Sequence, residues 1–518
     1  MTRARPPLAL VAPAAAAAVI AVIPIWYLID RSLERGVDEV IDELWQRRTL
    51  DLVLRSVGLT ATVTLLCVVI GVAAAWLVVR SGLPGRRALR VAFTLPLAVP
   101  SYLSAFAWIS WRPGLAGFTG ATLVLTLVSY PYVMLPVVSA LSRLDPAHDD
   151  VARSLGQSRL QVALRLTLPQ IRTSIAAGAL LVALYVLSDF GAVAAMRYEV
   201  FTWVIYGAYR AGFNPSRAAI LATVLVMLAL ALVLAESAVR GRAEARVGSG
   251  SPRAGNQVPL GRATPLAYLF VAAVLGPALV FPMWRIGVWV STYVSTDISV
   301  HDVGGALGQT LMLAALAAVA TVLLAFPTGV LAARSRSRLA RTLERTTYVG
   351  HALPGIVVAI SLVYVGVRLL RPIYLEVPLL VLGYVVLFLP LAVGAVRNSV
   401  EQSPPRMEEV ARSLGDGPMR VLRRVTAPLA LPGIGAGAAL VLLATMKELP
   451  VTLVLRPTGT ETLATRLWRY TSVSDYANAG PYALALVLFA AVPTALLSSF
   501  SGSDRTHSVR ARQSVEAT

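Results

Sequence analysis

Cysteine and lysine are almost absent from this 518-residue sequence, which has one of each. The cysteine, Cys67, lies within an apolar run, so disulfide bonds, thiolate clusters and Cys/His zinc sites are excluded. We expect it to be a small buried residue. The lysine, Lys447, is followed by Glu448. A P-loop needs Gly-x-x-x-x-Gly-Lys-Ser/Thr, so the chain carries no ATP-hydrolysing site of that class.

Charge is also sparse. Only 14% of residues are charged, whereas 57% are hydrophobic. Many apolar runs are about 20 residues long, which is enough to span a bilayer, so the sequence predicts an integral membrane protein. The net charge of +19 could indicate nucleic acid or anionic lipid. Nearly all of it is arginine in short segments between apolar runs, which favours the positive-inside bias of a protein embedded in lipid over nucleic-acid binding.

Twelve apolar runs are candidate spans, six in each half of an all-α polytopic membrane protein. The first follows a short basic segment as a signal peptide would, but it is long enough to span and more spans follow, so we expect a retained helix. The runs lie near residues 8–29, 58–79, 92–111, 121–141, 174–196 and 217–239, then 264–284, 306–333, 348–370, 376–396, 433–455 and 480–499.

Arginine placement predicts the orientation of these spans. With the N-terminus inside, the outside segments hold about half as many arginines as the inside segments, so both termini are expected inside. Residues 1–239 and 263–500 form the two halves. Residues 240–262 are rich in Gly, Ser, Pro and Arg and predict a flexible cytoplasmic linker. Residues 501–518 are polar and predict a disordered tail.

One segment occurs twice. The sequence from Asp150 aligns without a gap with that from Glu409, at an offset of 259 residues. Each copy follows the fourth span of its half, near 143–169 and 402–428, and is therefore expected in a cytoplasmic loop. Each copy has an acid that suits a helix N-terminus, a glycine for a turn or a close approach, and a proline just before the next span. A merely basic helical loop need not recur in one register.

Both copies resemble the EAA loop of ABC importer permeases. The pattern is Glu-Ala-Ala, three residues, Gly, nine residues, a branched apolar residue, one residue, then Leu-Pro. The departures are Asp for Glu in the first copy, Val for the first Ala in both, and Ala for Leu in the second. The matching positions are Asp150, Val151, Ala152, Gly156, Leu166, Leu168 and Pro169, then Glu409, Val410, Ala411, Gly415, Val425, Ala427 and Pro428.

The resemblance implies that each loop folds as a short coupling helix in a groove of an ATPase subunit, contacted by Asp150 and Glu409. It further implies two copies of a cytoplasmic ABC ATPase that bring ATP and Mg. A periplasmic or lipid-anchored substrate-binding protein and a bacterial inner membrane are implied as well. The chain itself is then a permease rather than an enzyme, with no cofactor and no assigned metal ligand.

Ionisable residues inside predicted spans are costly and mark cavities or partners. The fifth span contains Ser188-Asp189 and the eleventh contains Lys447-Glu448; the offset of 259 residues aligns the two pairs. One interpretation is that these four residues line the translocation path. The other is that Lys447 pairs with one or both acids and fixes the interface between halves. Gly191 and Pro450 follow the acids and predict local helix breaks. Pro96, Pro100 and Pro354 predict further kinks.

The segments Ser-Asp-Phe-Gly-Ala and Met-Lys-Glu-Leu-Pro resemble fused ferric iron permeases most closely, and oxygen donors suit a hard cation. Importers of thiamine, phosphonate or polyamine share this architecture and stay as alternatives. A twelve-span secondary transporter is an alternative of another class, although its loop pattern lacks the required acid and it has no paired EAA loops. A membrane-anchored sensor would need a signalling domain that the sequence does not supply.

Overall fold

The structure is a computed structural model, which describes residues 8–34, 36–211, 214–240, 260–292, 299–335 and 337–500. None of these residues forms a β-strand, and the fold is all-α. The predicted linker, apart from its first and last residues, and the predicted tail lie outside the described residues.

Among the described residues, the first half has thirteen α-helices, some of which are consecutive segments of one span. They are α1 Leu8–Leu33, α2 Val37–Trp45, α3 Arg47–Arg80, α4 Arg86–Thr94, α5 Ser101–Trp111, α6 Phe118–Ser129, α7 Pro131–Arg143, α8 Pro146–Ser154, α9 Arg159–Val162, α10 Leu168–Ser188, α11 Gly191–Ala195, α12 Phe201–Arg210 and α13 Pro215–Arg240.

The second half repeats this order with three differences: α2 has no counterpart, the first span is divided into α14 and α15, and the single helix α19 takes the place of α6 and α7. Its helices are α14 Thr264–Leu275, α15 Phe281–Thr292, α16 Val300–Arg334, α17 Arg338–Thr347, α18 Gly355–Arg368, α19 Val377–Gln402, α20 Pro405–Ser413, α21 Pro418–Val421, α22 Ala427–Lys447, α23 Pro450–Leu455, α24 Leu463–Ser472 and α25 Tyr476–Phe500.

The predicted spans are confirmed. Among the described residues, ten helical segments are long and apolar enough to cross a membrane, and two bent pairs raise the number to twelve if each is one span. The bent pairs are the third and ninth spans, with angles of 87° between α4 and α5 and 104° between α17 and α18. Pro100 and Pro354 stand immediately before α5 and α18. Proline disfavours helix in the residue before it and cannot donate to the preceding turn, so it breaks both spans at the same place.

The fifth and eleventh spans differ from the prediction in their limits. Residues 174–196 were expected to form one span, but α10 begins at Leu168 and ends at Ser188, and α22 likewise ends at Lys447. Five π-helical residues precede each helix, at Ala163–Thr167 and Leu422–Thr426. They end two residues before Pro169 and Pro428, which lack the N–H that a regular α-helix would use there.

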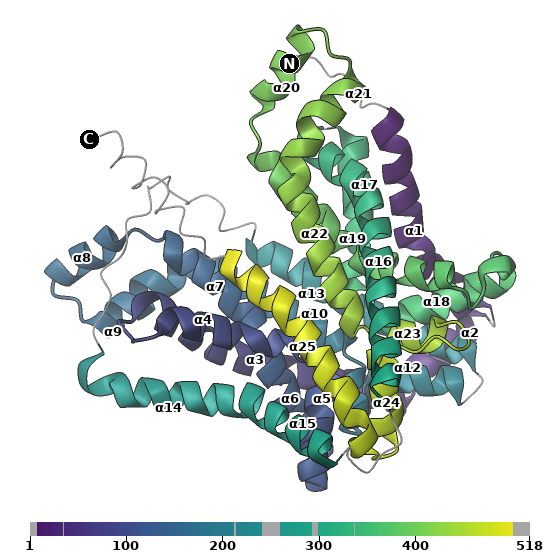
Figure 1. The fold of residues 1–518 in the computed structure, drawn as a ribbon, viewed down its shortest axis with the longest axis horizontal. Helices are drawn as coiled ribbons and strands as arrows, with labels where there is room; N and C mark the ends of the chain where they lie inside the picture. The colour runs from purple at the N-terminus through teal and green to yellow at the C-terminus, as the bar shows by residue number, and fades with distance from the viewer. Residues whose placement is uncertain are drawn as a thin grey trace.

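The first helix of each half packs against the other half. Helix α1 packs on α16, α17 and α18, and Figure 1 shows it beside α16 and α17. Ala17 of α1 belongs to the same buried cluster as residues of α16, α18 and α19. Conversely, α15 packs on α5 of the first half as well as on α25. The two halves are therefore interlocked rather than merely adjacent.

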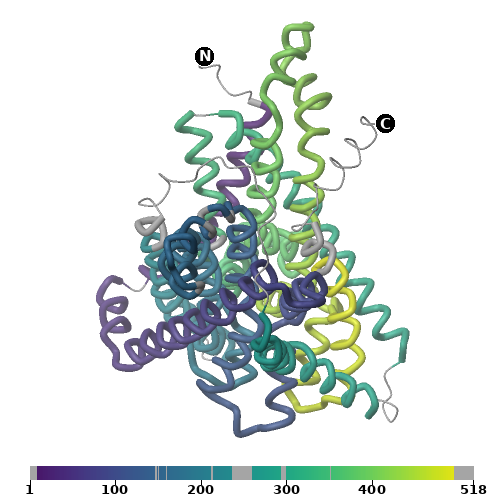
Figure 2. The backbone as a smooth tube through the Cα atoms, turned by 90° about the vertical axis from the view of Figure 1, so that its left-hand side faces the viewer, coloured from purple at the N-terminus to yellow at the C-terminus, as the bar shows by residue number. Residues whose placement is uncertain are grey.

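Helices α8 and α20 lie at separate corners of the molecule, whereas α12 and α24 lie near one another, away from both (Figure 1). The view turned by 90° also separates the segments that carry α8 and α20 (Figure 2). We call the end that carries α12 and α24 the distal end. Helix α10 runs from the side of α8 toward this end, and α22 runs toward it from the side of α20.

Candidate translocation site and coupling helices

A cavity of about 380 Å³ lies where the two halves meet. Residues of both halves line it, and all four residues singled out in the fifth and eleventh spans are among them: Ser188, Asp189, Lys447 and Glu448. The sequence register thus places the two aligned pairs at one site. The other lining side chains are mainly apolar or aromatic, which leaves Asp189, Lys447 and Glu448 as the charged groups of the cavity.

Asp189 is 7% exposed and lies at the break between α10 and α11. Its Oδ1 accepts hydrogen bonds from the backbone N–H of Ala192 at 2.9 Å and of Val193 at 3.3 Å. Its Oδ2 accepts one from Ser101 Oγ, on the first residue of α5. The carboxylate therefore satisfies free N–H groups in the first turn of α11, as an N-terminal capping acid does.

Glu448 repeats this arrangement in the second half. Its Oε2 accepts from the backbone N–H of Val451 at 3.0 Å and of Thr452 at 3.2 Å, in the first turn of α23. The residue that takes the place of Ser101 beside this acid is Gly355, the first residue of α18 in the broken ninth span. A Cβ atom added to Gly355 would lie only 2.8 Å from Glu448 Oε1. The shorter acid thus faces a serine and the longer acid faces a glycine.

Lys447 does not pair with either acid among the described residues. Its Nζ donates instead to the backbone carbonyl of Leu97 at 2.6 Å. Leu97 belongs to a short 3₁₀ turn of the first half, between α4 and α5. The predicted Lys447–carboxylate pairing is therefore not present, yet Lys447 does connect the two halves, through a carbonyl that sequence patterns cannot identify.

Aromatic side chains separate the cavity from the distal end. Phe190, which lines the cavity, lies with its ring centroid 5.6 Å from that of Trp468 on α24 and 5.0 Å from that of Tyr206 on α12. Tyr102, another lining residue, lies 6.5 Å from Trp468. Both halves contribute to this aromatic layer. It packs over the cavity on the side opposite the α8 and α20 ends of α10 and α22.

The two copies of the repeated loop fold as the short helices α8 and α20. Each ends in a Schellman turn, in which the glycine N–H bonds to Arg153 O or Arg412 O, both at 3.0 Å. Gly156 and Gly415 have φ values of 84° and 90°. A Cβ on either would meet nothing within 4 Å, so the glycines serve the left-handed turn and make no close approach within this chain.

The matched positions of the repeat face in two directions. Val151 and Val410 are 59% and 58% exposed. Ala152 and Ala411 are 9% and 8% exposed, so they pack mainly against their own chain. Glu409 is exposed on α20. The side chain of Asp150 lies outside the described residues, although its backbone is in α8.

The acid one position earlier makes a contact that the sequence reasoning missed. Asp149 Oδ2 accepts from Arg80 Nη1 at 2.7 Å, and Glu408 Oε1 accepts from Arg334 Nε at 2.9 Å. Arg80 and Arg334 are the last residues of α3 and α16. Each half thus ties its short helix to a span with an arginine–acid pair, which we call the span-end pair. The only sequence signal was an arginine at a span end, which the positive-inside bias already explains.

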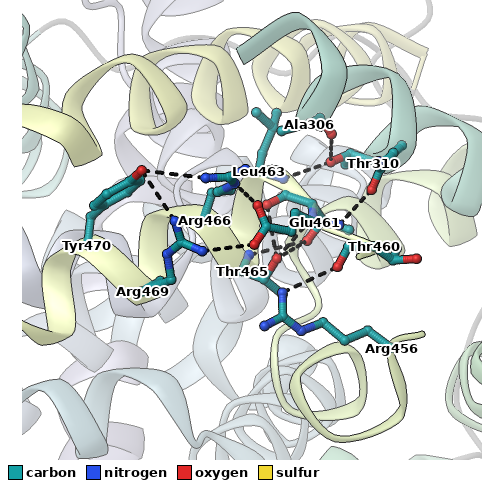
Figure 3. A network of polar contacts seen from close by, with 12 residues as sticks. Ala306, Thr310, Arg456, Thr460, Glu461, Leu463, Thr465, Arg466, Arg469 and Tyr470 are labelled. Carbon is teal, nitrogen blue, oxygen red and sulfur yellow. Dashed lines mark hydrogen bonds and ion pairs between the residues drawn. The ribbon is translucent and has the colours of Figure 1, made fainter. Parts of the chain in front are cut away.

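The distal end carries a second polar network, drawn in Figure 3. Glu461 forms ion pairs with Arg466 and, at 2.9 Å, with Arg469 Nη1 on α24. Its backbone N–H donates a hydrogen bond of 2.6 Å to Oε1 of Gln309, which lies on α16. Arg456, at the end of α23, donates to the carbonyl of Thr460 at 3.3 Å. This network holds the loop between α23 and α24 against α16.

Arg456 lies near three other positive charges. Burial lowers the pKa of its guanidinium, and the charges of Arg469, Arg466 and Arg210 lower this pKa further. Arg210 ends α12 in the first half, where its guanidinium lies over the ring of Tyr206 at 5.7 Å. Four arginines from both halves are thus gathered at the distal end, beside the aromatic layer.

Comparison with known proteins now places the chain in a family. Residues 67–240 and 325–502 each match the family described as the binding-protein-dependent transport system inner membrane component. The chain belongs to this family. The two matches fall one in each half, so the chain is a fused permease, and the secondary-transporter alternative is wrong. Multi-pass insertion in an inner membrane follows from the family and the apolar helices.

Three relatives show the range of the family. The Fe(3+)-transport system permease protein FbpB 2 of Haemophilus influenzae is 33% identical over 486 residues, covering 92% of this chain and 96% of the relative. A probable ABC transporter permease protein, y4fN of Sinorhizobium fredii, is 25% identical over 447 residues, 76% of this chain and 77% of the relative. The sulfate transport system permease protein CysW of Escherichia coli is 27% identical over 195 residues, 34% of this chain and 66% of the relative.

Proposed function

We propose that this chain forms the membrane-spanning part of an ATP-driven importer of ferric iron. The observation that carries the proposal is its 33% identity with a ferric iron permease along nearly the whole of both chains. The resemblance of the two polar segments at Asp189 and Glu448 to ferric iron permeases, noted from the sequence, supports the same substrate.

ATP hydrolysis is assigned to a separate subunit, which brings ATP and Mg and docks in two copies on α8 and α20. Each helix exposes apolar side chains at matched positions. Leu155 and Leu414 are 77% and 81% exposed, in addition to the valines described above. Exposed apolar residues beside a span-end pair form a rigid, repeated surface of the kind that a partner buries. Glu409, and Asp150 by its register, lie on the same helices.

The central cavity is proposed as part of the path. A ferric ion with six waters needs about 200 Å³, taking about 30 Å³ for each water and a similar share for the ion. The cavity of about 380 Å³ accommodates this. Asp189 and Glu448 supply carboxylate oxygens to it, the donors that a hard cation prefers. Ser188 and Lys447 complete its polar lining.

The distal end is proposed to face outward and to receive iron from a separate binding protein, with both chain termini inside. The arginine bias of the loops supports this orientation. So does the position of α8 and α20 away from the distal end, because an ATPase is reached from the cytoplasm (Figure 1).

Reconstitution tests the proposal. The permease is assembled in proteoliposomes with the ATPase and the binding protein encoded beside it, and accumulation of radiolabelled ferric iron is followed with and without ATP. We expect ATP-dependent accumulation that labelled sulfate, thiamine or polyamine does not reproduce. Iron uptake without ATP would contradict the importer class, and uptake of one of the other substrates in place of iron would contradict the substrate.

A further inference from the structure

Four arginines gather at the distal end and form what we call the distal arginine cluster: Arg210, Arg456, Arg466 and Arg469. Within the described residues, Glu461 is the acid that pairs with it, through Arg466 and Arg469. Asp302 on α16 also interacts electrostatically with Arg466, so four cations and two anions leave a formal charge of +2. Arg469 is half exposed, at 52% of its side chain, and Arg210 is exposed. The cluster thus presents positive charge to solvent beside the aromatic layer.

This charge has the wrong sign for a free ferric ion. Like charges within about 10 Å repel with little screening at moderate salt. A trivalent cation approaching alone would be repelled at the place where it must enter. Carboxylates, in contrast, form charge-assisted hydrogen bonds with guanidinium groups. The cluster is therefore suited to an acidic partner that brings the iron.

The cluster follows the internal repeat only in part, because Glu461 corresponds to Glu199 and Arg456 to Arg197, whereas Arg466 and Arg469 have no basic counterpart. Helices α12 and α24 correspond with an offset of 262 residues, from Phe201 to Leu463. Arg466 and Arg469 then occupy the positions of Val204 and Gly207 in the first half. The second half consequently contributes three of the four arginines, and the first half contributes Arg210. A partner present in one copy needs such asymmetry to dock in a single orientation.

We propose that the distal arginine cluster binds acidic side chains of the binding protein, and that these carboxylates displace Glu461 from Arg466 and Arg469. The proposal rests on the proposed function, which supplies a binding protein as the partner. The family description itself names transport that depends on a binding protein.

Displacement of Glu461 would act on the path through two short connections. The loop that carries Glu461 joins α23, whose first turn is held by Glu448, to α24, which carries Trp468. The loop is held on α16 by Gln309 and by Thr310, whose Oγ1 accepts from the Leu463 N–H at 2.9 Å (Figure 3). Docking at the cluster would thus act on α24, which contributes to the aromatic layer, and on α23, which lies at the cavity.

Two substitutions with opposite expected effects on affinity test the proposal. The full permease–ATPase complex is placed in nanodiscs, and its Kd for the iron-loaded binding protein is measured at low and moderate salt. We expect Arg469→Gln to weaken binding by about tenfold, equivalent to about 1.4 kcal/mol, and to reduce its salt dependence. Glu461→Gln should strengthen binding by several-fold, because it removes the internal competitor.

Arg112→Gln is the matched control, since Arg112 is an exposed arginine that follows α5 and lies outside the cluster; its Kd should equal that of the unchanged chain. The melting temperature of each variant checks folding. Unchanged Kd values in both Arg469→Gln and Arg466→Gln would overturn the proposal. A second result would also overturn the proposal: 10 mM inorganic phosphate changes iron uptake, the two variants abolish that change, and Kd stays constant. The cluster would then bind a free oxyanion.

The two proposals fail separately. Loss of affinity in the arginine variants, together with transport of a substrate other than iron, would keep the docking site and reject the ferric iron assignment. ATP-dependent iron uptake with full affinity in those variants would keep the assignment and reject the docking site.

Discussion

At the residue scale, the two acids of the cavity combine a charge with a capping role. Asp189 and Glu448 each accept backbone N–H groups of the short helix that follows. An amide oxygen can accept the same bonds, because Asn and Gln retain one carbonyl acceptor. The isosteric amides therefore separate the charge from the cap.

We expect Asp189→Asn combined with Glu448→Gln to leave the folded protein intact and to abolish most iron uptake. The measurements are the elution profile and melting temperature of the purified variant and ATP-dependent uptake in proteoliposomes. Normal uptake by the folded double variant would refute the path assignment. A protein that fails to assemble would show instead that the charges themselves stabilise the interface.

A second prediction concerns the two pairs at the cavity, Ser101 with Asp189 and Gly355 with Glu448. Gly355→Ser should destabilise the protein by about 1 kcal/mol, because its Cβ would lie 2.8 Å from Glu448 Oε1 and the carboxylate could move aside only by weakening its bonds to the Val451 and Thr452 N–H groups. Adding Glu448→Asp should restore stability, since it reproduces the Ser101–Asp189 combination of the first half. Melting temperatures check both.

Gly435→Ser serves as the control for that series, because a Cβ on Gly435 meets nothing within 4 Å. If Gly355→Ser melted at the temperature of the control, the steric argument would be wrong. If the added Glu448→Asp lowered the melting temperature further, the two halves would not use interchangeable pairs.

At the element scale, the span-end pairs are the contacts through which α8 and α20 hold their spans. Glu408 is the more enclosed, with its side chain 6% exposed. It also accepts from Thr426 Oγ1 at 3.1 Å and from Arg412 Nη2 at 3.2 Å. Removing Arg334 would leave this carboxylate with its weaker partners, at a cost of about 1–3 kcal/mol.

We therefore expect Arg334→Met to lower the amount of iron imported per ATP hydrolysed while the ATPase still binds. Arg80→Met should act in the same direction, and the double variant more strongly. Arg420→Met is the control, because Arg420 pairs with Asp416 on the exposed side of α21 with 60% of its side chain accessible. An unchanged ratio of transport to hydrolysis in the double variant would show that these pairs serve stability alone.

Much of this element-level organisation was accessible from the sequence. Apolar length predicted every span, prolines predicted the breaks before α5 and α18, and one register predicted both α8 and α20. The register also brought Asp189 and Glu448 to one cavity. The spacing of apolar residues and the steric restrictions of proline act locally along the chain, so both can be predicted from the sequence.

The parts that were missed depend on tertiary contacts. Lys447 binds a carbonyl, and every residue offers a carbonyl. Arg334 looks like any arginine at an inner span end until Glu408 is placed beside it. The arginines of α24 were counted only as outside charges, because their proximity to Arg210 arises from the meeting of two halves.

At the scale of the whole molecule, the exchange of first helices makes the halves interdependent. Two chains that end and begin at residue 250 should therefore co-purify when expressed together and support iron uptake, whereas each alone should fail to accumulate. An affinity tag on one chain and detection of the other measure this. Stable accumulation of the second chain without the first would show that it does not need α1.

Helix exchange also sets an order of events during synthesis. Helix α1 ends at Leu33, but its partner α16 begins at Val300, 267 residues later. At about 5–20 residues per second, a ribosome needs about 13–53 s to supply that partner. Until α16 emerges, α1 must remain in lipid without its neighbours from the second half, although α13 of its own half is made earlier. Its backbone is satisfied internally, as any helix in a bilayer requires. Its small-residue face, with Ala14, Ala17 and Ala21 fully buried once folded, is the surface that insertion factors would need to shield until α16 emerges.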